Sequence, residues 1–470
     1  MQTDPTWPTT TAHPQPTGAS HEVAPEEMFF STTDRRGVIT DANSVFVRLS
    51  RHPLDSLLGA PHSIIRHPDM PAGAFELMWS TLLAGDPFCA YVDNLAADGS
   101  RYTVLATVTP LADGGFLSVR TRPLCTDLLD TVRAMYAAAR PKELSAREAG
   151  ASARAAADVG LGDLAAQIEA AGIGTYTDVM HLALPAEIGA RRGAGIGIPH
   201  RPDAAGPVGR ILTSATELGV ALDGWSARQE ELAAVADQLV AAQERLTASM
   251  DSALDAANTF RDAIAAQAGF APALMTIDLW AQMMGIIVEV GDDLADDLST
   301  LRNSCRSTRF RVALGQLHDE AVGQFAAEIS DGGLEPQLAA RAGSSITMLC
   351  LAMTEEFELT RAEMARNAEL ADRTVGLIAN ASGLIAMPTD LIESWRAQVA
   401  GRDDEMVASL MPQVEEQIAL ARGSLGMLAE LGERCAGLAV PYDTGDADRA
   451  LAAVSAEATA LVESSAARAS

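Results

Sequence analysis

Residues 29–40 read FFSTTDRRGVIT and contain two short β-favouring segments with a turn between them. The segments are Phe29–Thr33 and Val38–Thr40, whose aromatic and β-branched side chains suit an extended, half-buried backbone. Asp34 opens and Gly37 closes the intervening stretch, a composition typical of a tight turn. We therefore predict a β-hairpin over residues 29–40, and the neighbouring elements can be placed outward from it.

Short helices are predicted after the hairpin. Ser44–Ser50 has apolar residues at helical spacing, and Gly59 suits the end of a further helical turn. Residue 71 is a proline, which fits the first turn of a helix because a backbone N–H there would have no helical partner. The segment Pro71–Ala84 carries an apolar stripe made of Phe75, Met78, Trp79, Leu82 and Leu83.

Three further strands are predicted after residue 87. They are Phe88–Leu95, Tyr102–Thr109 and Phe116–Thr121, separated by glycine-containing turns. Residues 29–122 then hold two strands, short helices and three strands, which is the order of a PAS domain. We expect an α+β PAS domain, a five-stranded antiparallel sheet with short helices, followed by a mostly α-helical bundle or coiled coil.

The rest of the chain has helical character. Hydrophobic residues make up 48% of the sequence but aromatic residues only 4%, a balance that suits helices better than strands. From Leu232 an apolar ladder with heptad-like spacing runs through Val235, Leu239, Ala242, Leu246, Ala253 and Phe260. The predicted organisation is a disordered leader (1–25), the PAS domain (26–123), connecting helices (124–192), a Gly/Pro linker (193–209), a helical signalling region (210–440) and a tail (441–470).

Bulk composition excludes several classes of protein. The formal net charge of −29 disfavours binding to nucleic acid or anionic lipid and favours neutral or basic protein partners. The five cysteines are scattered, with no CxxC pair and no histidine at metal-ligand spacing, so no zinc site or disulfide framework is expected. No apolar run is long enough for a transmembrane segment, and no catalytic constellation is recognisable. We expect a cytoplasmic protein with no membrane span and no enzymatic activity.

Several strings within residues 29–122 resemble the PAS domain of the aerotaxis-receptor family, and residues 66–71 (RHPDMP) are the most specific. The others include Ser31 to Asp34, Asn43 with Phe46, Gly59-x-Pro61-His62, Met78-Trp79, Val92-x-Asn94 and Ser118 to Thr121. The resemblance implies a noncovalently bound FAD used as a redox-sensitive chromophore inside the PAS core. On that basis the cofactor-binding residues would be Arg66, His67, Asp69, Asn43, Trp79 and Asn94.

Other interpretations of these residues stay open. His67 and Asp69 also fit a purely structural turn before the helix, and Trp79 lies on the apolar stripe and also fits the core. The chain departs from the family at Phe88, Asp93 and Thr103, where the family has Trp, a basic residue and the second residue of a Tyr-Trp pair. These departures leave FMN, another ligand or an empty pocket as alternatives to FAD.

The leading hypothesis is a signal-transduction protein that senses redox state or oxygen through the flavin and relays it by helix repacking to a partner protein, as in energy taxis. The alternative is a ligand-free PAS module for dimerisation or docking on a helical scaffold. The apolar ladder predicts a homo-oligomer formed through the helical region. The spacing within residues 310–329 resembles the hairpin tip of chemoreceptors, which would make the helical region a degenerate chemoreceptor-like bundle. An ordinary alanine-rich amphipathic hairpin gives the same pattern and is the alternative.

Overall fold

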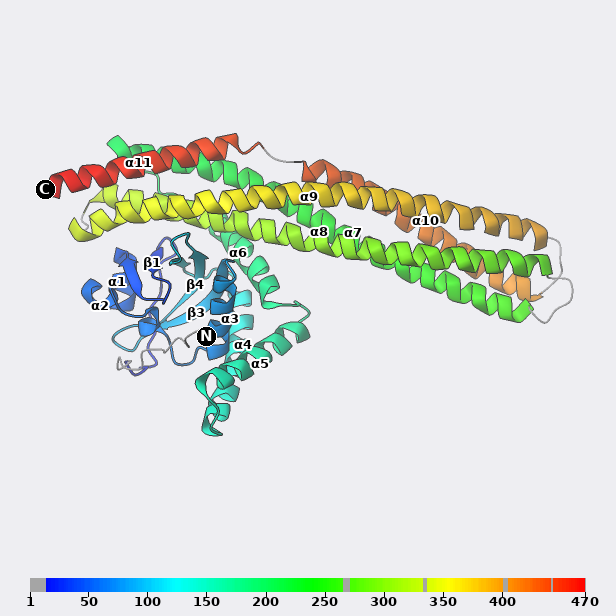
Figure 1. Cartoon of the computed structure of the whole chain (residues 1–470), viewed down its shortest axis with the longest axis horizontal. Coiled ribbons are helices and arrows are strands. Elements are labelled where there is room, and N and C mark those ends of the chain that lie inside the picture. Colours follow the sequence, from blue (N-terminus) through cyan, green and yellow to red (C-terminus); the bar gives the residue numbers. More distant parts are fainter. Residues whose placement is uncertain (1–13, 265–270, 333–335, 400–404, 441–442, 470) are drawn as a thin grey trace. The chain divides into compact units, whose positions relative to one another are not determined.

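The computed structural model describes residues 14–264, 271–332, 336–399, 405–440 and 443–469 (Figure 1). The chain divides into two compact units. Of the described residues, the first unit holds those from 14 to 226, from 309 to 359 and from 443 to 469, and the second holds those between 227 and 308 and between 360 and 440.

A five-stranded sheet lies in the first unit, with the strand order β2-β1-β5-β4-β3. All of its strand pairs are antiparallel, which confirms the predicted α+β fold. The strands are β1 (Phe29–Thr33), β2 (Ile39–Ala42), β3 (Phe88–Leu95), β4 (Arg101–Pro110) and β5 (Phe116–Thr121). β1 lies between β2 and β5, and its first four residues are buried.

Short helices cover one face of this sheet. They are α1 (Ser44–Ser50), α2 (Leu54–Leu57), a 3-10 turn (His62–Ile65) and α3 (Ala72–Leu83). Phe29 of β1 stacks on Phe46 of α1 at a ring separation of 4.0 Å. Phe116 of β5 meets the edge of Trp79 from α3. We call this the helix-covered face; Phe30, next to Phe29 along β1, lies on the opposite, outer face.

Two buried glutamates fasten the connecting helices α4 (Thr126–Glu148), α5 (Ala153–Ala170) and α6 (Tyr176–Gly193) to the sheet domain. Glu143 of α4 accepts hydrogen bonds from the first two backbone N–H groups of α3, both at 2.8 Å, and so caps that helix. Glu187 of α6 accepts from the Tyr91 hydroxyl at 2.8 Å and from two backbone N–H groups before α4. Gly73 permits close packing, because a Cβ there would lie 2.4 Å from a backbone nitrogen of α5.

Residues 14–25 are bound to the domain, so the expectation of a disordered leader is wrong for this stretch. The backbone N–H of Thr17 donates to the carbonyl of Gly99, and that of His21 donates to the carbonyl of Arg101. The apolar pattern of the sequence does not reveal this order, because the order comes from backbone hydrogen bonds to the turn between β3 and β4. Residues 1–13 lie outside the described residues.

Five helices form the remainder of the described chain. They are α7 (Gly206–Ile264), α8 (Ala271–Asp331), α9 (Pro336–Val399), α10 (Glu405–Ala439) and α11 (Gly445–Ala469). The backbone of α9 is helical from end to end, through Gly383 and Pro388. Within the described chain, no helix is both long and apolar enough to cross a membrane.

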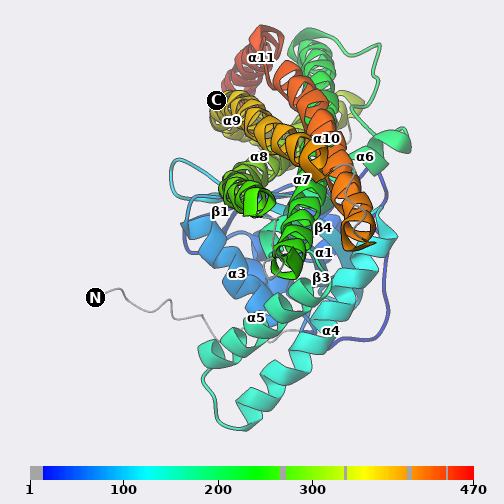
Figure 2. The same ribbon diagram turned by 90° about the vertical axis from the view of Figure 1, so that its right-hand side faces the viewer.

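The core of the second unit is formed by α7, α8, α9 and α10 (Figures 1 and 2). From α7 it contains five members of the predicted apolar ladder, which are Leu232, Val235, Leu239, Ala242 and Leu246. The side chains of Ala253 and Phe260 lie outside the described ones. α8 contributes Leu294, Leu298 and Leu301, and α9 and α10 complete the core. The ladder therefore serves as a helix-packing seam within one chain.

Helix α8 also buries an imidazole in the first unit. His318 is fully buried, and neither of its ring nitrogens has a hydrogen-bond partner among the described residues. Burial lowers its pKa to about 4, against about 6.5 in an unfolded chain. The unfolded chain therefore binds more protons between these values, so stability is full above about pH 6.5 and is lost as pH falls toward 4.

The free energy of unfolding of the wild type should fall between pH 7 and pH 5, and we expect His318→Met to reduce that fall by up to roughly 2 kcal/mol. Urea denaturation at several pH values measures this quantity. His200→Met, at an exposed position before α7, is the matched control and should keep the wild-type slope. An unchanged slope in the His318 variant would contradict the expectation.

Candidate ligand-binding site

A cluster of polar side chains interrupts the helix-covered face of the sheet. At its centre is Arg120 of β5, which is 8% exposed and lies over the ring of Phe29 at 4.8 Å. Its Nε donates to Ser118 Oγ at 3.2 Å, and its Nη1 lies 3.5 Å from Asn94 Oδ1. Its Nη2 contacts the imidazole of His62 at 3.3 Å. We call Arg120, His62, Asn94, Ser118 and Tyr102 the core polar cluster.

The core polar cluster carries a positive charge without a compensating carboxylate. Burial lowers the pKa of Arg120 to about 10, so the guanidinium remains protonated at neutral pH. Burial, together with Arg120, holds the pKa of His62 well below its usual value, so the imidazole is neutral. Within the described residues Arg120 makes no ion pair with Asp or Glu. A buried cation among neutral groups is costly unless something negative or electron-rich joins it.

Two further atoms of the cluster have no hydrogen-bond partner in the described part of the chain. They are Asn94 Nδ2 and the hydroxyl of Tyr102. Both side chains are at most 1% exposed, and they face each other as a residue pair of β3 and β4. Buried polar atoms in folded proteins nearly always find a partner. Unpaired donors close to Arg120 therefore fit a ligand with hydrogen-bond acceptors at its edge.

Arg66 and Asn94 are the two sequence-predicted site residues that the structure brings together. A backbone bridge joins them. The guanidinium of Arg66 lies over the ring of Phe75 at 3.8 Å, and burial lowers its pKa to about 10. Trp79 lies on the same side of the sheet, where Gly37 and Phe116 adjoin its ring. These positions are compatible with a ligand on the helix-covered face.

His67 and Asp69 are arranged as the structural alternative describes. The backbone N–H of Asp69 donates to His67 Nδ1 at 3.2 Å, which closes the turn before α3. His67 is buried, whereas the Asp69 side chain is 67% exposed and pairs with Arg101 at 2.6 Å. The Asp69 carboxylate therefore points to the surface ion pair, away from the core polar cluster.

Asn43 is occupied by the backbone. Its Oδ1 accepts from the N–H groups of Phe30 and Phe46, both at 3.0 Å, and its Nδ2 donates to the carbonyl of Met28 at 2.7 Å. The side chain thereby caps α1 and ties it to β1. This arrangement leaves Asn43 a structural role in place of the ring contact that was expected.

The cluster members Arg120, His62 and Tyr102 were not among the predicted site residues. The alternation of side chains along β5 could have identified Arg120. Residues 116, 118 and 120 lie on one face of β5, so the buried aromatic Phe116 shares its face with a serine and an arginine. A charged side chain on a face otherwise suited to the core suggests a functional position.

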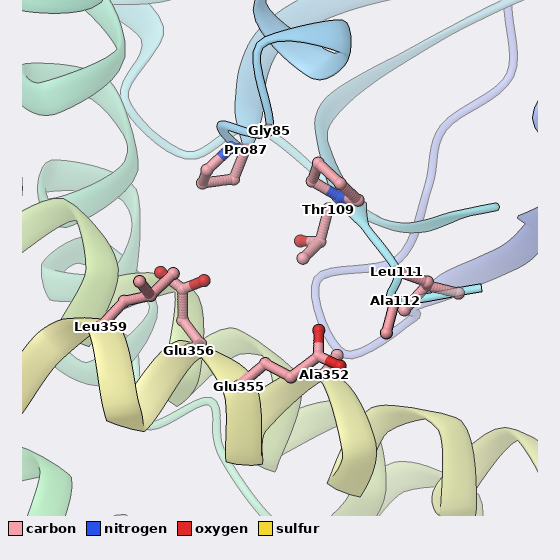
Figure 3. Close-up of a pocket in the computed structure, with 10 residues that line it drawn as sticks. Gly85, Pro87, Thr109, Leu111, Ala112, Ala352, Glu355, Glu356 and Leu359 are labelled. Carbon is pink, nitrogen blue, oxygen red and sulfur yellow. The ribbon is translucent and has the colours of Figure 1, made fainter. Parts of the chain in front are cut away.

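A separate cavity of about 200 Å³ lies at one end of the sheet (Figure 3). It is lined by the turn after α3, the end of β4 and a stretch of α9 that includes Glu355 and Glu356. Glu356 pairs with Arg311 at 2.6 Å, and no lining residue belongs to the core polar cluster. Among the residues described, no group of three or more His, Cys, Asp or Glu side chains could hold a metal ion.

The structural role of Asn43 predicts a stability defect. Asn43→Ala would leave two buried N–H groups unpaired and should lower the free energy of unfolding by about 2 kcal/mol. Asn43→Asp keeps the two acceptor contacts and loses only the donor, so its loss should be smaller. Urea denaturation of the three proteins checks the order, and equal stability of wild type and Asn43→Ala would contradict it.

Two curated proteins are similar to part of this chain. The aerotaxis receptor of Escherichia coli (strain K12) is 40% identical over 115 residues, which is 24% of this chain and 23% of the receptor. The nitrogen fixation regulatory protein of Klebsiella pneumoniae is 35% identical over 81 residues, 17% of this chain and 16% of that protein. The chain thus matches less than a quarter of the length of either relative.

No family model matches the chain. Among solved structures, one described as an RsLOV d2 variant is 19% identical and covers 31% of this chain and 90% of its own, with a TM-score of 0.21. The strand order and the 40% identity to the receptor carry the assignment of the first domain. Residues 29–122 form a PAS domain similar to that of the aerotaxis receptor, and a long helical region follows it.

Proposed function

We propose that this protein is a signal-transduction protein whose PAS domain binds a flavin, FAD, on the helix-covered face of the sheet. The observation that carries the proposal is the core polar cluster, in which Asn94 and Tyr102 have unpaired donors and Arg120 lies over the ring of Phe29. A flavin would supply what these groups lack, because its flat ring suits aromatic walls and its edge carries carbonyl oxygens and ring nitrogens. Arg66, Asn94 and Arg120 are the residues that would hold it.

The named relatives support a sensory role. One is an aerotaxis receptor and the other a nitrogen fixation regulatory protein, and both names describe signalling or regulation. For this chain we propose sensing of redox state or oxygen, with relay to a partner protein in the cytoplasm. The net charge of −29 favours a neutral or basic partner, for which the helical region is the proposed surface.

A relay needs a contact whose favoured arrangement differs between the oxidised and the reduced protein. β1 supplies one, because Phe29 lies beside the core polar cluster while Phe30 meets Phe325 of α8 edge to face at 5.3 Å. Asp41 of β2 pairs with Arg341 of α9 at 2.6 Å on the same outer face. A shift of β1 caused by the ligand would therefore change the packing of α8 directly.

An absorption spectrum tests the flavin proposal. The freshly purified protein, or the protein after incubation with FAD, should show a flavin spectrum. Asn94→Ala should weaken FAD binding by roughly tenfold, as expected for one buried hydrogen bond. Ala substitution of exposed Leu83 is the matched control and should bind like wild type. A folded protein that stays colourless with added FAD would refute the proposal and favour the ligand-free docking module.

Phe325→Leu tests the relay. This substitution keeps an apolar side chain but removes the ring contact with Phe30, so the flavin should remain bound. The difference in amide hydrogen exchange of residues 309–331 between oxidised and reduced protein should fall to roughly half or less of wild type. Leu351→Ala, at a position 60% exposed on α9, should leave that difference intact. A full wild-type difference in Phe325→Leu would exclude this contact as the relay.

A further inference from the structure

We propose that Arg120 contacts the electron-rich edge of the flavin ring and stabilises its reduced, negatively charged form, so that this one side chain raises the reduction potential of the bound flavin. The inference rests on the proposed function and adds to it the residue that makes ligand binding depend on redox state. When an external reductant such as dithionite delivers two electrons and one proton is taken up from water, the ring gains one net negative charge. Arg120 keeps its proton throughout.

The charge environment of Arg120 is the first argument. Arg191, another buried arginine, has its Nε 3.0 Å from Glu320 Oε2 and is neutralised by that carboxylate. Arg66 has Glu143 as a nearby negative charge. Arg120 contacts only neutral groups among the described residues, so its positive field acts undiminished on a neighbouring ligand.

Positioning is the second argument. His62 contacts the guanidinium on one side, and Ser31 Oγ lies 3.1 Å from His62 Nε2, which fixes the imidazole. Asn94 and Ser118 hold the other nitrogens. The guanidinium is therefore fixed over the Phe29 ring, beside the unpaired Asn94 amide, before any ligand arrives. Such preorganised charge costs no rearrangement when negative charge develops nearby.

The titratable groups around Arg120 do not compete with this role. Among the described residues, His62 and Tyr102 are titratable groups that interact electrostatically with Arg120. His62 is neutral, and burial raises the pKa of Tyr102. Neither supplies a negative charge at neutral pH, so the ligand is the partner that the guanidinium lacks.

The test is the midpoint potential of bound FAD, measured anaerobically by dye equilibration in wild type, Arg120→Gln, Arg120→Lys and Arg133→Gln. Arg120→Gln removes the charge and should lower the preference for reduced over oxidised FAD about tenfold, which lowers the potential by ~30 mV for a two-electron couple. Arg120→Lys should retain most of the wild-type potential. Arg133→Gln makes the same charge change on α4, where Arg133 pairs with Asp93, and should match wild type.

A potential for Arg120→Gln equal to or above that of wild type would overturn the inference while leaving flavin binding established. A wild-type protein that binds no FAD in either redox state would overturn the proposed function, and the inference with it.

A second measurement decides the matter if Arg120→Gln fails to fold or to bind FAD. In protein labelled with ¹³C at the arginine guanidinium carbon, the reduced-minus-oxidised infrared spectrum of wild type should contain isotope-sensitive guanidinium bands. These bands should disappear in Arg120→Lys, whereas Arg133→Gln should keep them. Absence of isotope-sensitive bands in wild type, or their persistence in Arg120→Lys, would contradict the inference.

Discussion

Burial of β1 on both faces is the constraint on which the first unit depends. Because successive side chains of a strand point to opposite faces, Phe29 and Phe30 must each find an apolar partner on a different side of the sheet. Phe29 finds Phe46 of α1, and Phe30 finds Phe325 of α8. A PAS sheet with only its own short helices would leave Phe30 exposed. The outer layer is therefore part of the folded domain, and the helix-covered face and the outer face are separated by the thickness of one strand.

Carboxylates located far along the sequence fix the outer elements to this sheet. Glu143 caps α3 from α4, Glu187 receives the Tyr91 hydroxyl from β3, and Glu320 of α8 pairs with Arg191 of α6. Each of these acids is buried, and each has donors that satisfy its oxygens, as burial of a charge requires. These three buried carboxylates are thus each satisfied, Glu187 by neutral donors and Glu320 by Arg191. Arg120 stands apart from this pattern, because its partners among the described residues are all neutral groups.

Much of the domain could be predicted from local sequence. The hairpin over residues 29–40, helix α3 and strands β3 to β5 follow from alternation, helical spacing and turn residues, and the structure has each of them. The binding of residues 14–25 to the β3–β4 turn could not be predicted, because it depends on backbone hydrogen bonds between segments far apart in sequence.

The candidate site was harder to predict than the fold, and for a physical reason. Asn43, Asp69 and Asn94 have side chains of similar chemistry, yet one caps a helix, one lies in a surface ion pair and one is buried with an unpaired amide. Residue type gives the hydrogen-bonding capacity, but only the surroundings show how much of that capacity is already used. By this criterion Asn94, whose Nδ2 has no partner among the described residues, retains unused capacity, whereas both polar atoms of Asn43 are engaged by the backbone. The unpaired Asn94 amide and Tyr102 hydroxyl therefore mark the candidate site more sharply than the sequence motif of residues 66–71 does.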